Sequence, residues 1–265
     1  MKIYNFLDND DVQVVAQQGS FQVIEWKRDL SVSYGGATAA YFASEMNVRR
    51  RQLVCTLDGR MGVILQAGAM QWTAGHIEST TGVKGVGDLI GKMARGAVTK
   101  ESAIKPEYVG VGLVVLEPTY RHILLINPVH LGGSMTVNDG LFYACESTVQ
   151  QKAVMVSRPS AMVAGGEGLF NLALTGQGAV ALESPVPASE LVTIDLENDE
   201  LKVDGNFAIA WTSSLQFTVE RSGKSLIGSA VNGEGLVNVY RGSGRVLLAP
   251  VAAPTFGVNA GTGAV

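Results

Sequence analysis

Hydrophobic residues alternate with polar or small residues over many short stretches of the chain. In the segment 203–211 the odd positions hold hydrophobic residues or glycine, from Val203 to Trp211, and Asp204 and Asn206 fall between them. A period of two is typical of strands that have one buried face and one exposed face. The alternation therefore predicts an all-β fold that is built mainly from short strands.

Helical patterns are confined to two main segments. Residues 35–46 are rich in alanine and carry Phe42 and Met46, which favours a connecting helix of about three turns. Between Val86 and Ala97 the hydrophobic residues follow helical spacing, with charged residues on the opposite face. We expect this second, amphipathic helix to be an excursion from the strand framework.

A string of the form Gly-x-Gly-x-Val-x-Leu occurs at 110–116, 176–182 and 242–248, each copy starting 66 residues after the one before. A constant interval of this length indicates an internal repeat. The glycines of the three strings are Gly110, Gly112, Gly176, Gly178, Gly242 and Gly244. Glycine reaches positive φ at little cost and allows close backbone approach, so we expect a sharp turn in the strand path at each pair.

The repeat divides the chain into units, each ending at a proline that withdraws an N–H donor: Pro118, Pro185 and Pro250. The units are a leader over 1–52, three β modules over 53–118, 119–184 and 185–250, and a tail over 251–265. We predict β-sandwich-like modules around a pseudo-threefold axis, with the leader strands and connecting helix packed on this body.

Composition and charge exclude several classes of function. Hydrophobic residues make up 46% of the chain and charged residues 17%, which together with 32 glycines indicates a compact, turn-rich protein. The net charge of −4 gives no general attraction to phosphate backbones, so nucleic-acid binding is not expected. No apolar run approaches the ~20 residues of a membrane span, and the N-terminal residues lack a secretory pattern. A cytoplasmic protein is the expectation.

The reactive residue types do not form a recognisable motif. Cys55 and Cys145 make neither a CxxC pair nor a disulfide framework, which predicts reduced core thiols. His76, His122 and His130 lack metal-ligand spacing, so each is read as a surface or core histidine. We expect no catalytic residue, metal or cofactor.

Two pairs of polar residues recur at repeat or near-repeat spacing. Glu117 and Glu183 are 66 residues apart, which allows a carboxylate pair if they meet, but repeat geometry favours a structural role. Asn171 and Asn238 interrupt hydrophobic strands, and their side chains are expected to form hydrogen bonds to neighbouring backbone.

The cluster at residues 49–51, three consecutive arginines, is best explained as a solvated face or a salt-bridge site.

Several of these strings together are similar to those of a known family. They are the string at 65–70, the amphipathic insertion, Gly-Glu-Gly-Leu-x-Asn at 166–171 and 233–238, and the three Gly-x-Gly closures. Over roughly residues 50–250 the chain resembles the mitochondrial biogenesis family called altered inheritance of mitochondria 24. The resemblance implies an all-β fold related to the tryptophan RNA-binding attenuator protein, a bacterial member, and no defined activity. The acidic balance argues against transferring RNA binding.

The leading hypothesis is a non-enzymatic structural or interaction protein that forms homo-oligomers through strand edges or apolar faces. An alternative is a small-ligand binder with sites at module junctions, near Trp72 and Trp211. A weaker alternative is a peripheral membrane-organising protein that uses the segment from Val86 to Ala97. The weakest alternative is an enzyme that uses Glu117 or Glu183.

Overall fold

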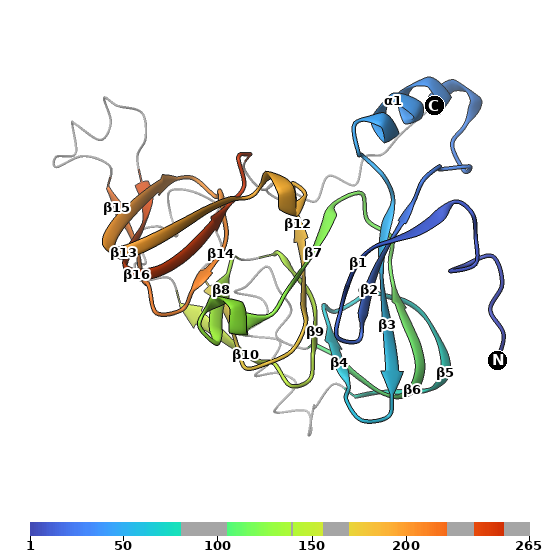
Figure 1. Ribbon diagram of the computed structural model, residues 1–265, viewed down its shortest axis with the longest axis horizontal. Coiled ribbons are helices and arrows are strands. Elements are labelled where there is room, and N and C mark those ends of the chain that lie inside the picture. The colour runs from blue at the N-terminus through green and yellow to red at the C-terminus, as the bar shows by residue number, and fades with distance from the viewer. Residues whose placement is uncertain (81–104, 139, 156–169, 222–235, 252–265) are drawn as a thin grey trace.

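The computed structural model describes residues 1–80, 105–138, 140–155, 170–221 and 236–251. Within these residues the chain forms two antiparallel sheets, one α-helix and three short 3-10 helices (Figure 1). The prediction of a largely β fold is confirmed. The predicted helix over 35–46 is present as α1 (Ala37–Glu45), preceded by the 3-10 helix η1 (Tyr34–Gly36). The predicted helix between Val86 and Ala97 lies outside the described residues.

The first sheet has nine strands in the order β1-β2-β3-β6-β4-β9-β12-β7, with β5 paired to β6. The strands are β1 (Val12–Gln18), β2 (Phe21–Trp26), β3 (Arg51–Asp58), β4 (Val63–Leu65), β5 (Met70–Thr80), β6 (Glu107–Leu116), β7 (His122–Ile126), β9 (Phe142–Glu146) and β12 (Val180–Ser184). The two end strands, β1 and β7, are far apart along this path.

The first sheet curls into a nearly closed barrel. Its interior is a cluster in which Phe21 of β2 and Leu53 of β3 pack with Ile123 of β7, and Ala16 of β1 joins them at the margin. Residues from both ends of the sheet therefore share one hydrophobic core. Because β1 and β7 do not pair with each other among the described residues, the barrel stays open between them.

The second sheet has seven strands in the order β10-β11-β8-β14-β16-β13, with β15 paired to β16. The strands are β8 (Ser134–Val137), β10 (Gln150–Met155), β11 (Phe170–Thr175), β13 (Val192–Asp204), β14 (Ala208–Thr212), β15 (Gln216–Arg221) and β16 (Leu236–Leu248). A core cluster joins the sheets, because Leu182 of β12 packs with Met135 of β8 and Leu174 of β11. The remaining 3-10 helices are η2 (Pro128–Leu131) and η3 (Ala188–Glu190).

The three glycine strings lie in comparable strands but bend them to different degrees. Gly110 and Gly112 lie inside β6, and Gly242 and Gly244 lie inside β16, so these strands continue through the string. At Gly176 and Gly178 the path is interrupted, and β11 ends before β12 begins. A break in the strand is therefore found only for the middle string. Close approach requires glycine at Gly110 and Gly112, where β6 pairs with β5, and less tightly at Gly244.

The sheets do not coincide with the sequence units. Residues 119–184 contribute β7, β9 and β12 to the first sheet and β8, β10 and β11 to the second. The middle unit therefore places three strands in each sheet, and residues of both sets share one core cluster. The physical reason is that its strands break at short turns, so that each half pairs with different neighbours.

Candidate functional site: a cleft between the ends of the first sheet

A cleft of about 680 Å³ lies where the barrel stays open. One wall is β1 from Val15 to Gln18 and the other is all of β7, so both open strand edges border the same space. Pro187, Ala188 and Leu191, in and around η3, close one side. The cleft thus combines residues of the leader with residues of the second and third units.

An ion-pair cluster forms the polar part of the cleft. The strand register places Glu25 of β2 directly opposite Arg51 of β3, and their side chains meet at 2.6 Å. Arg49 binds the other carboxylate oxygen of Glu25 at 3.0 Å. Glu25 and Arg51 are only 5% and 3% exposed, so this pair is buried. The predicted salt-bridge role of the three arginines is confirmed, since Arg50 also pairs with Asp29 at 3.7 Å.

Arg51 also fixes the end of α1. Its guanidinium donates to the backbone oxygen of Asn47 at 3.0 Å and to the Asn47 side-chain oxygen at 2.7 Å. Asn47 has φ of 62°, a left-handed conformation that asparagine tolerates better than most residues. The cleft floor and the helix are therefore connected through one buried arginine.

His122, the first residue of β7, lines the cleft. Burial and, to a smaller extent, the positive charge of Arg51 lower the pKa of its imidazole from 6.5 to about 4, although the negative charge of Glu25 acts in the opposite direction. The ring is therefore neutral at physiological pH. Like charge and partial desolvation both disfavour the imidazolium.

We expect the stability of the folded state to fall as the pH drops from 7 to 5. The unfolded chain takes up a proton on His122 near pH 6.5, whereas the folded chain resists it down to about pH 4. The loss should be on the order of 1 kcal/mol after allowance for the solvent-exposed part of the ring. Urea unfolding of His122→Gln should show a flatter pH dependence. His130→Gln, at an exposed site, should keep the wild-type slope; equal slopes in wild type and His122→Gln would contradict the interpretation.

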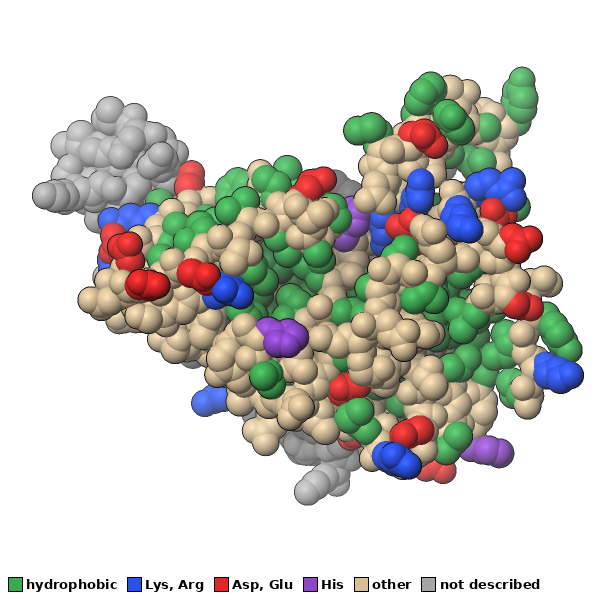
Figure 2. Space-filling model, viewed as in Figure 1, with side chains coloured by type: hydrophobic (Ala, Val, Ile, Leu, Met, Phe, Trp, Pro, Cys, Tyr) green, Lys and Arg blue, Asp and Glu red, His purple; other side chains and the backbone are tan. Residues whose placement is uncertain are grey.

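A second surface of interest surrounds α1. None of the residues of α1 is buried, and the helix borders a cavity of about 700 Å³ whose opposite side is formed by residues such as Trp26, Arg50 and Tyr120. Figure 2 shows hydrophobic side chains over the projecting helix, with charged side chains gathered at its base. We call the large exposed hydrophobic residues here the α1 patch: Leu30, Tyr34, Tyr41, Phe42, Met46 and Val48.

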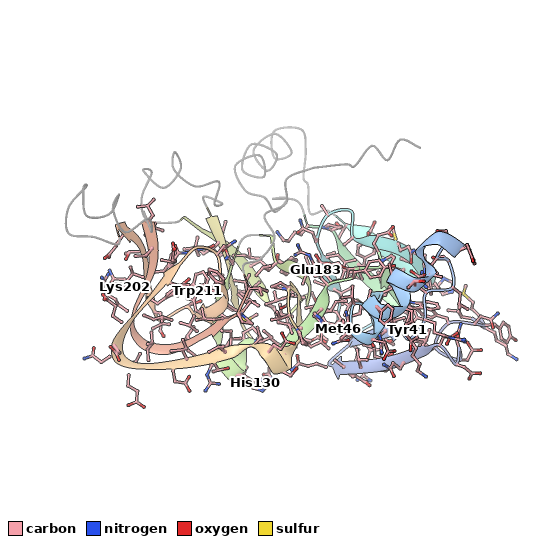
Figure 3. The ribbon with its side chains drawn as sticks, turned by 90° about the horizontal axis from the view of Figure 1, so that it is seen from above. Tyr41, Met46, His130, Glu183, Lys202 and Trp211 are labelled. Atoms are coloured by element: carbon pink, nitrogen blue, oxygen red, sulfur yellow. The ribbon has the colours of Figure 1, made fainter. Side chains whose placement is uncertain are left out.

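The exposure of the α1 patch is unusually complete. Tyr34 is 100% exposed, Met46 78% and Leu30 75%. Tyr41 and Met46 lie in the other half of the molecule from Trp211 and Lys202 (Figure 3). Contiguous exposed apolar surface of this kind marks an interaction site more often than a free surface.

Charged and aromatic groups hold the base of the α1 patch in place. The Arg50 guanidinium lies over the Trp26 ring at 4.6 Å. The Tyr120 hydroxyl donates to Asp29 at 2.6 Å. Hydrogen bonds from Ser31 and then Tyr120 lower the pKa of Asp29 to about 2. Asp29 thus remains a carboxylate, and the base of the patch is rigid and charged.

The other residues singled out in the sequence are dispersed. Cys55 and Cys145 are free and buried, as predicted. His76 and His130 are exposed on β5 and η2. Trp72 packs edge-on against Phe6, with the ring centres 5.1 Å apart. Trp211 lies in the core of the second sheet with Phe217 and Tyr240, so neither tryptophan lines the cleft.

Glu117 and Glu183 lie outside both cavities. Burial raises the pKa of the Tyr143 hydroxyl, and the negative charges of Glu183 and Glu117 raise it further. The Tyr143 hydroxyl donates to the Glu117 backbone oxygen at 2.6 Å, which is a structural contact. Asn238 donates to the backbone oxygen of Gly205 at 3.0 Å, which confirms that this asparagine holds a turn.

Neither surface described above was predicted from the sequence. Residues 35–46 were expected to be a connector, although the only charged residue among them is Glu45 and the aromatic residues Tyr41 and Phe42 are adjacent. The sequence did contain one indication of this exposed surface, which is that the predicted helix has no polar face. The cleft had no comparable signal, because its walls are brought together from β1, β7 and η3 by the closure of the barrel.

Within the described residues no helix is long and apolar enough to cross a membrane, and no group of three or more His, Cys, Asp or Glu is placed to hold a metal ion. The fold and its surfaces define a two-sheet antiparallel β protein with an open barrel, a junction cleft and an exposed apolar helix. Residues 42–251 match the model of the family described as mitochondrial biogenesis AIM24, and the chain belongs to this family.

Two similar proteins come from Streptococcus pyogenes. The uncharacterized protein M6_Spy0233 of Streptococcus pyogenes serotype M6 is 26% identical over 193 residues, covering 70% of this chain and 75% of that protein. The crystal structure of SPYM3_0169 from Streptococcus pyogenes matches with a TM-score of 0.58 and 24% identity, over 78% of this chain and 90% of the other. These likenesses support the fold and the family and assign no activity.

Proposed function

We propose that the protein is a non-enzymatic scaffold that assembles into homo-oligomers through the α1 patch. The observation that carries this proposal is a nine-residue helix with no buried residue. Isolated helices of this length are marginal in water, because packing supplies most helix stability in proteins. No side-chain hydrogen bond caps the N-terminus of α1 either. A covering surface from outside the chain would stabilise the helix.

A second copy of the chain fits this surface. Its rim carries both signs of charge, with Glu45 on the helix and Lys27 and Arg28 beside it, so two copies related by a twofold axis could place acid against base. The cavity between α1 and the strands offers room for an aromatic side chain of the other copy, such as Phe42. Aromatic anchors in such pockets dominate interface energies.

The proposal extends to the repeat. The three glycine strings occupy similar positions in the strand pairing, because each lies in or next to a strand that has a partner on both sides. For the first string β6 lies between β3 and β5, and for the third β16 lies between β13 and the strands β14 and β15. The middle string separates β11, which lies between β8 and β10, from β12, which lies between β7 and β9. This similarity supports descent of the three units from one ancestral module, and a pseudo-threefold relation among them.

The buried free cysteines and the bacterial relatives support a bacterial cytoplasmic scaffold.

Light scattering coupled to size exclusion tests the assembly. At micromolar concentration we expect at least twice the chain mass of 27.9 kDa. Phe42→Ser should weaken association by about tenfold or more, because it removes a central aromatic contact. Val129→Ser, at a similarly exposed valine on η2, should leave the mass unchanged.

A strictly monomeric wild type would contradict the scaffold proposal. Flotation with anionic lipid vesicles would then distinguish the alternative. If the monomer floats and Phe42→Ser does not, the α1 patch serves a peripheral membrane role instead of self-association.

A further inference from the structure

We propose that the cleft between β1 and β7 binds an extended peptide segment of a partner protein, which enters as an added strand and carries an acidic side chain. This inference goes beyond the scaffold role, because it concerns a different surface and a different occupant. It rests on the backbone edges of the cleft, on its side chains and on its charge.

The first argument for an added strand comes from the backbone edges of the cleft. Among the described strands β1 pairs only with β2, and β7 pairs only with β12, so the other edge of each strand has no ladder partner. Both open edges border the same cleft. An open edge presents backbone N–H and C=O groups that favour pairing with another extended chain. The five residues of β7 span ~16 Å, which matches a peptide of about five residues.

The second argument comes from the side chains that line the cleft. Ala16, Val23, Leu125 and Leu191 supply apolar surface for alternate side chains of an extended peptide. Gln18 lines the same cleft, and its side-chain oxygen is buried without a hydrogen-bond partner among the described residues. An amide N–H of the bound segment would satisfy this oxygen. Buried polar atoms are otherwise nearly always paired.

The third argument comes from the charge of the cleft, which favours an acidic residue in the bound peptide. Arg51 and Glu25 line the floor of the cleft, and Arg49, outside the lining, binds the same carboxylate, so the cluster holds two arginines against one carboxylate. His122 beside it is neutral at physiological pH. The local charge is therefore positive. An aspartate or glutamate of the peptide would complement it, and the attraction should weaken with salt.

A peptide explains the cleft better than a small molecule does. Its donors and acceptors repeat at the strand spacing along the whole edge, whereas a small ligand satisfies a few groups at one point. An added strand would also cover an exposed edge of the first sheet, of the kind that other β proteins must protect.

A displayed library of random peptides of about seven residues, selected on the full chain, tests the proposal. Ala188→Arg fills the cleft from η3 at an exposed position, and Ser189→Arg adds the same charge next to it outside the cleft lining. We expect enriched peptides to alternate apolar residues and contain Asp or Glu. Their binding, measured by fluorescence polarisation, should weaken at least tenfold in Ala188→Arg and little in Ser189→Arg.

Two further measurements keep the test decisive. Replacing the peptide carboxylate with its amide should weaken binding by about threefold to tenfold, and added salt should reduce that difference. Hydrogen exchange of the wild-type chain should slow at residues 15–18 and 122–126 when peptide binds, independently of any variant's folding. No enrichment, equal binding by both arginine variants, or protection elsewhere would overturn the proposal.

Discussion

Replacing Gly110 with alanine should destabilise the protein by about 4 kcal/mol or more, among the largest effects of any single substitution. Gly110 lies in β6 opposite Ile77 of β5, with φ of +126°. A β-carbon at this position would overlap the backbone oxygen of His76. Backbone atoms of a paired strand cannot move aside without breaking the ladder, so the clash adds to the strain of the positive φ.

Gly68→Ala is the matched control for this prediction. Gly68 also has a positive φ, of +80°, but nothing lies within 4 Å of an added β-carbon. Its substitution should cost only the backbone strain, about 1 kcal/mol. Urea unfolding of both variants measures the difference. Similar losses at Gly110 and Gly68 would show that close approach of β5 and β6 is not what requires the glycine.

Replacing Glu25 with glutamine should cost about 3 kcal/mol or more of unfolding free energy. The carboxylate of Glu25 accepts from Arg49 and Arg51 and also from the side-chain amide of Gln13 at 3.1 Å. Glutamine removes the charge that compensates the buried Arg51 and directs an N–H₂ group toward these donors. Removing one partner of a buried pair leaves the other charge without compensation.

Asp11→Asn provides the comparison at an exposed ion pair. Asp11 binds Arg28 at 2.7 Å, but the Arg28 side chain is 67% exposed, so solvent can replace the interaction. We expect little change in the urea midpoint for this variant. If Glu25→Gln were as mild as Asp11→Asn, the cluster at residues 49–51 would be a solvated charge group and not a buried support of the cleft.

Much of the local structure follows from local sequence. The alternation around Val203 to Trp211 predicted strands, and β13 and β14 cover most of that segment. The alanine-rich stretch predicted α1 to within two residues of either end. Each closing proline lies within two residues of the end of β6, β12 or β16. These features depend on backbone preferences and on the period of burial, which act over a few neighbouring residues.

The candidate sites could be predicted only in part. Three consecutive arginines indicated ion pairs, but Glu25, the acceptor of Arg49 and Arg51, lies on another strand and is identified only by the register between β2 and β3. Similarly, nothing in the residues of β7 indicated that its free edge would face β1. Long-range pairing depends on which turns close and which strands meet, and a single stretch of sequence does not encode this.

By itself the sequence determined that this protein is a β protein with a 66-residue recurrence, buried thiols and a positive cluster before its first repeat. Only the tertiary structure decided how the strands of the middle unit divide between two sheets, where the barrel remains open, and that α1 buries none of its residues. The physical reason is the distance along the chain over which each effect acts. Periodicity and turn chemistry act locally, whereas closure and exposure depend on the packing of elements that are far apart in the chain.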